Sequence, residues 1–507
     1  MAITLFVLVK VINDVFQFSN NLPNQVYELL VSSAFNAVLV PAFVSAQKRA
    51  DHNRFITAIF TVTLGALAGI TVVVTLAAPL IVKIMGVSLP EDWFWVVVWM
   101  SVLCLPQIFF YGMHTVLGQY LNANGRFAAY AWTPVLNNVV GIGGLVMFYL
   151  FYRAGTAAGD ALSNPANWGP QPLLVLCGMT TLGIALQALF LLIPLWQTGF
   201  RPEFPIRLRG LGLRAPIKQA MWAGASVFLI YIGVWAQSNV AIAAFSYTQI
   251  TGIEVPSVSE RTVATLFYAV PYAVLILSVV NVIFPDIVRA VEDSDESRLK
   301  SQMLRFHNFI GPIGVLCSVL LMTGSLLLAQ LMTIVTEYDP FLIAIVLAAI
   351  SVGIIPLASG ALNERVLYAS NRAKYTFFAQ IPANLFKLLT CSIAVFALPQ
   401  IAWVPFAAFG EGIGLALYAI ICHYAIKVPG RPSLTEELRC YLRPLLGGAV
   451  AAAVGLGFLW LVGFYSTGYL DLLARCAGLL ALEVLVFTFI GVSRQTRTEF
   501  LVLLRRR

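Results

Sequence analysis

The sequence has little charge. Only 11% of its 507 residues are Asp, Glu, Lys or Arg, whereas 60% are apolar. Soluble domains carry roughly 25% charged residues, so this chain could not cover the surface of a globular protein of its length. The scarcity of charge excludes a cytosolic enzyme, and the long apolar blocks exclude a disordered or coiled-coil chain. The class that remains is an all-α polytopic membrane protein.

Patterns that would indicate a metal centre, a disulfide framework or catalysis are missing as well. The seven cysteines lie far apart without a C-x-x-C pair, and no two of the four histidines share ligand spacing. The sequence contains no Walker loop, no catalytic-triad pattern and no H-E-x-x-H motif. We therefore expect no metal, no cofactor and no enzymatic activity.

Apolar segments long enough to cross a bilayer, about 20 residues each, recur along the whole chain. A shorter apolar segment at about 2–18 is expected to be the remainder of a first helix rather than a cleavable signal, because it lacks a basic start and a cleavage site. We therefore predict about fourteen transmembrane helices. The thirteen longer segments lie at about 26–47, 55–84, 93–116, 128–152, 172–197, 218–246, 262–288, 306–336, 341–363, 375–397, 401–426, 444–465 and 472–492.

Lys and Arg gather in alternate loops between these segments. One set of loops, together with the C-terminal tail, holds 25 of the 31 basic residues. Loops rich in Lys and Arg face the cytoplasm, so both termini are predicted to be cytoplasmic. Because the basic residues follow the membrane topology, the net charge of +8 does not indicate a nucleic-acid partner.

Ionisable residues inside apolar segments mark candidate functional positions, because charge in hydrocarbon is costly. Lys10 and Asp14 are four residues apart and could pair with each other. Lys387 is expected to snorkel or to bind a helix end. Glu411 lies between two glycines and fits either a close helix contact or a functional site, and Glu483 falls near the middle of the last segment.

A polar run surrounds Pro23 at the join of the first two apolar segments. Polar groups beside such a proline favour a broken helix that lines a water-filled space. The run consists of Gln17, Ser19, Asn20, Asn21, Asn24, Gln25, Tyr27 and Glu28.

Several strings, in order along the chain, resemble the MurJ (MviN) family of lipid flippases. They match the second helix of that family, the loop between its helices 4 and 5, the proline spacing of its helix 8 and the loop after its helix 10. The strings are Asn21–Asn24, Tyr27–Leu30, Asn36–Phe43, Leu121–Ala129, Trp132–Asn138, Pro271 with Phe284-Pro285, and Arg365–Lys374.

The resemblance implies two six-helix lobes around a central cavity and two further helices that add a hydrophobic groove. These parts fall on residues 1–200, 201–430 and 431–507. The implied protein lies in the bacterial plasma membrane and moves lipid II, or a related polyprenyl-pyrophosphate lipid, to the outer leaflet by alternating access. The implied partners are membrane lipids and proteins of cell division and peptidoglycan synthesis.

The resemblance also suggests which residues bind the substrate. Asp14 matches an aspartate of the family, whereas two arginines of its second helix fall on Tyr27 and Glu28, and a glutamate falls on Ser32. The arginines of the family's first helix have no counterpart, and Arg261 is expected to substitute for them. The candidate cavity residues are Asp14, Asn20, Asn24, Tyr27, Glu28, Ser32 and Arg261.

Two other functions fit the same sequence. One is a transporter of the same superfamily that exports another polyprenyl-linked glycan or a small molecule. The other is a scaffold that does not transport and recruits enzymes of wall synthesis, which the missing arginines favour.

Overall fold

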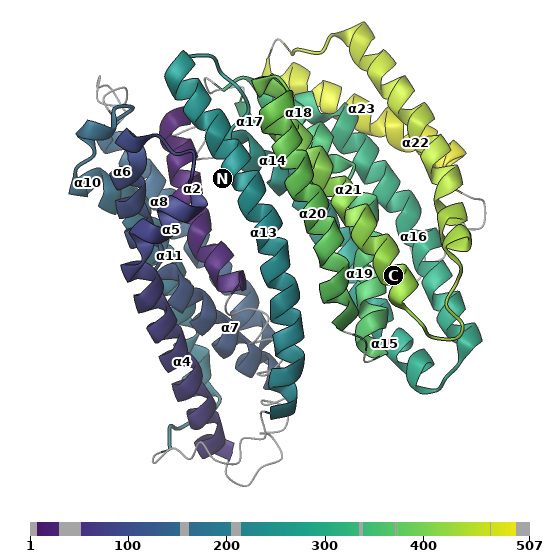
Figure 1. The fold of residues 1–507 in the computed structure, drawn as a ribbon, viewed down its shortest axis with the longest axis horizontal. Coiled ribbons are helices and arrows are strands. Elements are labelled where there is room, and N and C mark those ends of the chain that lie inside the picture. Colours follow the sequence, from purple (N-terminus) through teal and green to yellow (C-terminus); the bar gives the residue numbers. More distant parts are fainter. Residues whose placement is uncertain are drawn as a thin grey trace. The chain divides into compact units, whose positions relative to one another are not determined.

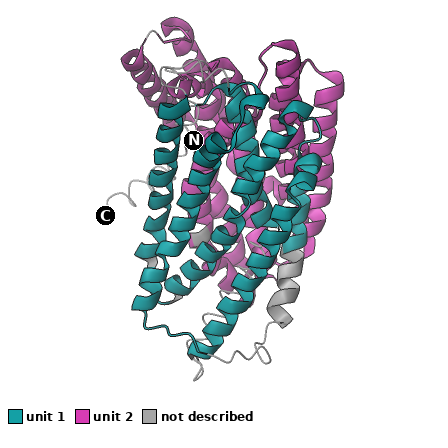
Figure 2. Ribbon diagram, turned by 90° about the vertical axis from the view of Figure 1, so that its left-hand side faces the viewer, with its two compact units in different colours: residues 1–231 teal, residues 232–507 magenta. Residues whose placement is uncertain are grey.

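The computed structural model describes residues 8–29, 52–152, 162–203, 214–333, 338–370, 372, 374–466 and 468–492. Within these ranges the regular secondary structure is entirely helical (Figure 1). The chain forms two compact units, Met1–Tyr231 and Ile232–Arg507 (Figure 2). The boundary falls inside one long helix, α13 (Arg214–Thr251). The division into parts at residues 200 and 430 stays a prediction.

Unit 1 is built from helices that cross it lengthwise and from short helices that extend or connect them. A π-helical turn, Leu174–Gly178, joins two of these helices into one span, Pro170–Gln197. The helices are α2 (Lys10–Tyr27), α4 (His52–Leu76), α5 (Ala78–Met85), α6 (Glu91–Cys104), α7 (Gln107–Ala123), α8 (Phe127–Tyr152), α10 (Pro170–Leu173), α11 (Met179–Phe190) and α12 (Leu192–Gln197).

Unit 2 continues from α13 with a larger set of helices. A π-helical turn, Tyr272–Ile276, links the first two of them behind Pro271. The helices are α14 (Val258–Pro271), α15 (Leu277–Glu292), α16 (Glu296–Thr323), α17 (Ser325–Thr333), α18 (Pro340–Ser351), α19 (Ile354–Ala369), α20 (Lys374–Ala397), α21 (Trp403–Ala425), α22 (Leu434–Val462) and α23 (Tyr469–Ile490).

Twelve helices in the described ranges are long and apolar enough to span a membrane. Each coincides with one of the twelve predicted segments from 55–84 onward, which confirms the all-helical membrane fold. The predicted segment at 26–47 lies almost entirely outside the described residues, so the total of fourteen stays a prediction.

The predicted boundary between the first two segments is wrong. Helix α2 does not end near residue 18 but continues to Tyr27, with Pro23 inside it. A proline removes one backbone hydrogen bond without ending a helix when neighbouring helices support it. The polar run therefore lies along one continuous helix instead of at a break, and its side chains reach α6 and α7.

Polar caps fix where several helices of unit 2 begin. Ser433 and Glu436 form a reciprocal capping box at the start of α22, and Ser257 and Glu260 form another at the start of α14. Asp295 accepts from the first turn of α16. Such caps satisfy backbone N–H groups that have no partner within the helix, so these starts are set locally by sequence.

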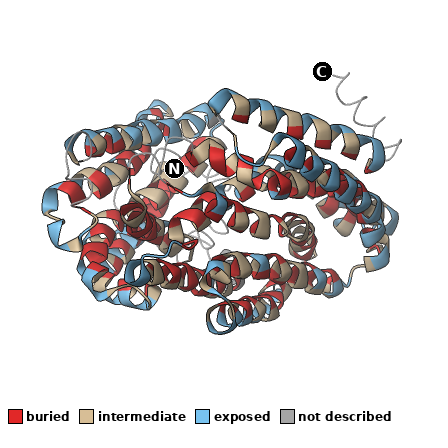
Figure 3. Cartoon of the chain, turned by 90° about the horizontal axis from the view of Figure 1, so that it is seen from above, coloured by how far each residue is buried: buried red, intermediate tan, exposed pale blue. Residues whose placement is uncertain are grey.

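Each unit has its own apolar core. In unit 1 one cluster includes Phe55, Phe60 and Tyr120, from α4 and α7. In unit 2 one cluster runs through α13 to α21, and smaller clusters attach α22 and α23 to α16 and α17. Large apolar side chains remain exposed on α8, α22 and α23, as expected for helix faces in contact with lipid. Figure 3 shows that buried and exposed residues lie on different sides of the same helices.

Candidate functional site

The first half of α2 carries a buried polar surface inside unit 1. Asn13, Asp14, Gln17 and Ser19 are all at most 2% exposed. The Gln17 amide donates to Asn13 Oδ1 at 3.1 Å, and the Ser19 hydroxyl donates to the backbone carbonyl of Val97 in α6 at 3.4 Å. Buried polar groups are costly without partners, so this surface fixes α2 against the rest of the unit.

A chain of side-chain amides and hydroxyls links α2 to α7 and α11. The fully buried Gln107 amide donates to Thr181 Oγ1 at 2.9 Å and reaches Asn20 Oδ1 at 3.5 Å. The Thr181 hydroxyl donates in turn to the carbonyl of Leu103 at 2.7 Å. Asn20, one of the predicted cavity residues, therefore belongs to a hydrogen-bond network that connects α2 with α7, α11 and α6.

Tyr27 anchors the end of α2 to α7. Its hydroxyl lies 2.7 Å from Thr115 Oγ1, and its ring lies 5.8 Å from the ring of Tyr111. Because the Thr115 hydroxyl already donates to the Tyr111 carbonyl at 3.0 Å, Tyr27 is the donor. Asn24 is exposed and Glu28 is half-buried.

The structure leaves two of the earlier expectations untested. Ser32 lies outside the described residues. Lys10 and Asp14 are both placed on α2, and their pairing stays a prediction.

A second polar group in unit 1 was not predicted from the sequence. The ring nitrogen Nε2 of His114 lies 2.9 Å from Thr133 Oγ1 and 3.2 Å from Gln187 Nε2, and its ring stacks on Tyr130 at 4.8 Å. These residues come from α7, α8 and α11, which only the tertiary fold brings together. The isolated histidine inside an apolar segment was the available signal.

Unit 2 contains a charged cluster around Arg261, one turn into α14. Arg261 donates to Gln237 Oε1 at 3.1 Å and to Ser238 Oγ at 3.4 Å, both on α13. Glu411 on α21 lies close enough to act electrostatically on Arg261, and its Oε1 lies 3.8 Å from Lys387 Nζ on α20. Arg261 is thus the predicted residue around which further charged side chains gather.

Lys387 is not a snorkelling residue. Its side chain is only 7% exposed, and Glu411, at 23%, is its partner. Side chains added at Gly233 of α13 or Gly414 of α21 would come within 3.0 Å and 3.1 Å of the Lys387 stem. The stem is therefore enclosed by three helices, and the ammonium group is directed to the carboxylate beside it instead of to the membrane surface.

The expected close helix contact at Glu411 is present, and its functional role stays a prediction. The flanking Gly410 lies against Thr390 of α20, and Gly412 lies against Gly353, so the segment is a close helix contact. Glu411 itself is not satisfied by backbone groups but faces Lys387. The small neighbours bring the helices together, and the carboxylate supplies the charge.

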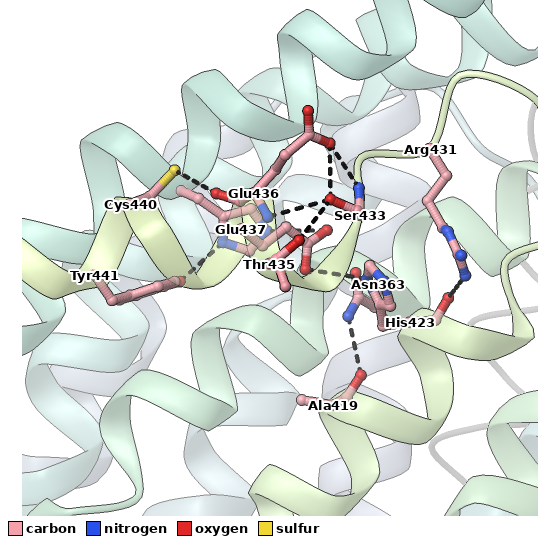
Figure 4. Close-up of polar contacts among 11 residues, drawn as sticks. Asn363, Ala419, His423, Arg431, Ser433, Thr435, Glu436, Glu437, Cys440 and Tyr441 are labelled. Carbon is pink, nitrogen blue, oxygen red and sulfur yellow. Dashed lines mark hydrogen bonds and ion pairs between the residues drawn. The ribbon is translucent and has the colours of Figure 1, made fainter.

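Two histidines and a glutamate form a further polar cluster, where α22 meets α16 and α21. Figure 4 shows Glu437 of this cluster beside His423. Glu437 Oε2 lies 3.1 Å from His423 Nδ1, and Oε1 lies 3.6 Å from His307 Nε2, with all three side chains at most 3% exposed. His307 Nδ1 also lies 2.8 Å from the Tyr441 hydroxyl. This cluster ties α22 to two other helices of unit 2.

Glu483 on α23 is fully buried away from both charged clusters. It packs against Gly455 of α22 and lies close to Thr323 of α16. Among the described residues, no group of three or more His, Cys, Asp or Glu side chains could hold a metal ion.

Solved structures of membrane transporters share this fold. A structure of lipid II flippase MurJ in an inward closed conformation aligns with a TM-score of 0.70 at 14% identity, covering 96% of this chain and 95% of that one. A multidrug resistance MATE family transporter of the MOP superfamily, inward-facing, aligns at 0.60 with 15% identity over 86% and 94%. The fold therefore defines a multi-pass α-helical membrane protein.

Sequence comparison identifies the family. The model of the family Lipid II flippase MurJ matches residues 3–471, so the chain belongs to that family. A probable lipid II flippase MurJ of Rhizobium tropici is 25% identical over 316 residues, 59% of this chain and 53% of that protein. One of Vibrio cholerae is 30% identical over 149 residues, 27% of this chain and 28% of that protein. The chain thus spans about half the length of the Rhizobium relative it matches.

Proposed function

We propose that this protein moves lipid II, the undecaprenyl-pyrophosphate-linked peptidoglycan precursor, from the inner to the outer leaflet of a bacterial plasma membrane. The observation that carries the proposal is the match of the lipid II flippase family across residues 3–471. The proposed activity is transport by alternating access and not an enzymatic reaction, and it needs no cofactor.

The head group of the proposed substrate needs polar contacts inside the membrane, and the polar clusters of the protein could provide them. The head group of lipid II is large, polar and anionic, so crossing hydrocarbon unaided is prohibitive. We assign contacts with this head group to the predicted set, and Arg261 with its neighbour Lys387 to the pyrophosphate. The predicted set is Asp14, Asn20, Asn24, Tyr27, Glu28, Ser32 and Arg261.

The same proposal includes orientation and partners. Because 25 of the 31 basic residues fall in alternate loops and the C-terminal tail, both termini are assigned to the cytoplasm. Proteins of cell division and peptidoglycan synthesis are the proposed protein partners, since they use the lipid after it crosses.

The test is direct transport in liposomes. The full chain is reconstituted with fluorescently labelled lipid II, and the accessibility of the label to a quencher that cannot cross the bilayer is followed over time. Protein-free liposomes give the background. An undecaprenyl-phosphate-linked glycan runs in parallel, and faster movement of lipid II alone is the expected result. If lipid II moves no faster than in protein-free liposomes, the proposed function is wrong.

Arg261 provides the matched test of the site. An ionised contact with phosphate contributes about 1.5–3 kcal/mol, so Arg261→Ala is expected to slow flipping roughly 10- to 100-fold. The control is Arg289→Ala at the end of α15, where the guanidinium is 65% exposed and pairs with Asp286 at 3.5 Å. Equal flipping rates for the two variants would show that Arg261 does not contact the substrate.

A second candidate function is the flipping of a different polyprenyl-linked glycan or a small molecule. It is favoured by the positions where Tyr27 and Glu28 replace arginines of the family, which changes the charge offered to a head group. Movement of the control glycan without lipid II would support it. A scaffold without transport would instead tolerate Asp14→Ala and Glu28→Ala in a complementation assay.

A further inference from the structure

The charged cluster of unit 2 carries more positive than negative charge. It contains the guanidinium of Arg261 and the ammonium of Lys387, and among the described residues Glu411 is the carboxylate that acts on both. Gln237 and Ser238, the hydrogen-bond partners of Arg261, are neutral. Two cations and one carboxylate leave one positive charge without a counter-ion.

An uncompensated charge away from bulk water is unfavourable and attracts an anion. Lys387 cannot reach solvent easily, because Gly233 and Gly414 enclose its stem and its side chain is only 7% exposed. Arg261 is held by two hydrogen bonds to α13. Both cations are therefore fixed in place, and the cluster is organised in advance for an anionic group.

Glu411 is the adaptable member of the cluster. Its carboxylate is 23% exposed, more than three times as much as its partner. The Nζ to Oε1 distance of 3.8 Å is well beyond the 2.7–2.9 Å of a charge-assisted hydrogen bond. The carboxylate thus balances Lys387 electrostatically without being bound to it, and a second anion could take over this role.

We propose that Glu411 is the internal counter-ion of an anion subsite, which balances Lys387 and Arg261 in the empty protein and yields them to a phosphate group of the substrate. This inference rests on the proposed function, because the substrate class it names is the pyrophosphate-bearing lipid. Glu411 then sets how tightly the anion is held: its charge weakens binding and permits release.

The first experiment measures binding to the full chain in detergent, with inorganic pyrophosphate and, separately, undecaprenyl pyrophosphate in mixed micelles. Glu411→Gln is expected to tighten binding about tenfold or more, because a unit charge several ångströms away at an effective dielectric constant of about 20 changes affinity by at least that factor. Lys387→Met is expected to weaken binding by a similar factor. Glu411→Asp keeps the charge and is expected to bind as the wild type does.

A fourth variant guards against a Glu411→Gln protein that fails to fold. Gln237→Glu places a second carboxylate against Arg261 and is expected to weaken binding about tenfold. Monodisperse elution and an unchanged helical circular dichroism spectrum identify folded variants. Unchanged affinity in both the Glu411→Gln and the Gln237→Glu protein would overturn the inference.

The two probes separate the sources of the anion. If Glu411→Gln tightens the binding of undecaprenyl pyrophosphate, the lipid is supported as the ligand, whether or not the binding of inorganic pyrophosphate also tightens. If Glu411→Gln tightens only the binding of inorganic pyrophosphate, a lipid ligand at this subsite is contradicted.

Transport separates this inference from the proposed function. If wild-type liposomes flip lipid II but the variants bind both probes equally, the subsite is wrong and the function stands. If the binding pattern holds but no lipid moves, the function is wrong and the anion subsite stands. Arg289→Ala, outside the cluster, is the control in both assays.

Discussion

Replacing Glu437 by alanine removes the carboxylate that two buried histidines share. Glu437 lies 3.1 Å from His423 and 3.6 Å from His307, and all three side chains are at most 3% exposed. Removing one partner of a buried polar contact costs about 1–3 kcal/mol for each group left unsatisfied, and here two imidazoles lose the same carboxylate. We expect Glu437→Ala to lower the free energy of unfolding by about 3 kcal/mol.

The assay is reversible unfolding in mixed micelles of a mild detergent and sodium dodecyl sulfate, followed by circular dichroism. Glu436→Ala, one residue earlier, is the matched control, because that carboxylate pairs with Lys300 at 2.8 Å on the exposed side of α22. The control is expected to lose about 1 kcal/mol, because the exposed pair contributes little and the capping box with Ser433 is lost with it. A Glu437→Ala loss below about 0.5 kcal/mol, the range of ordinary surface substitutions, would refute this reasoning.

The double replacement His423→Glu with Glu437→His tests whether the contact between these two side chains matters more than each side chain by itself. It restores one carboxylate and one imidazole across α21 and α22 with exchanged positions. We expect the double variant to recover at least half of the stability lost in either single variant. If the stability loss of the double variant equals the sum of the losses in the two single variants, the two side chains act independently through packing.

Three further predictions concern single contacts. Tyr27→Phe removes the hydrogen bond to Thr115, 2.7 Å long, and is expected to cost about 1 kcal/mol in the same unfolding assay. Gly183→Ala places a methyl group against the neighbouring helix α8 and should cost about 1–3 kcal/mol, whereas Gly65→Ala meets nothing within 4 Å and should be neutral or slightly stabilising. Ser433→Ala removes the capping box of α22 and should cost about 1 kcal/mol, visible as faster amide exchange in the first turn of that helix.

The helix positions could be predicted from the sequence because an apolar segment that crosses a membrane has few alternatives to a helix. Twelve predicted segments coincide with the helices of the structure, since a backbone in hydrocarbon must satisfy its hydrogen bonds within each segment. The prediction was wrong at Pro23, inside α2. There the neighbouring helices keep α2 continuous. The residues around Pro23 in the sequence do not reveal which helices will pack against it.

Which polar side chains contact each other could not be predicted from the sequence, because these contacts depend on how the helices pack. The sequence marked Lys387 and Glu411 as separate ionisable positions, 24 residues apart, and gave no reason to pair them with each other. The structure pairs them because α20 and α21 pack closely through Gly410 and Thr390. Likewise His114 and His423 gave no pattern in sequence, because their partners come from other helices.

The sequence by itself determined that this protein is a polytopic helical membrane protein and that it resembles the flippase family to which it belongs. Hydropathy and the spacing of basic residues act locally along the chain, so both properties can be read without coordinates. The tertiary structure alone decided which charges meet: Lys387 with Glu411 near Arg261, and Glu437 with its two histidines. These contacts depend on which faces of distant helices pack together, and that packing depends on side-chain shape across the whole unit.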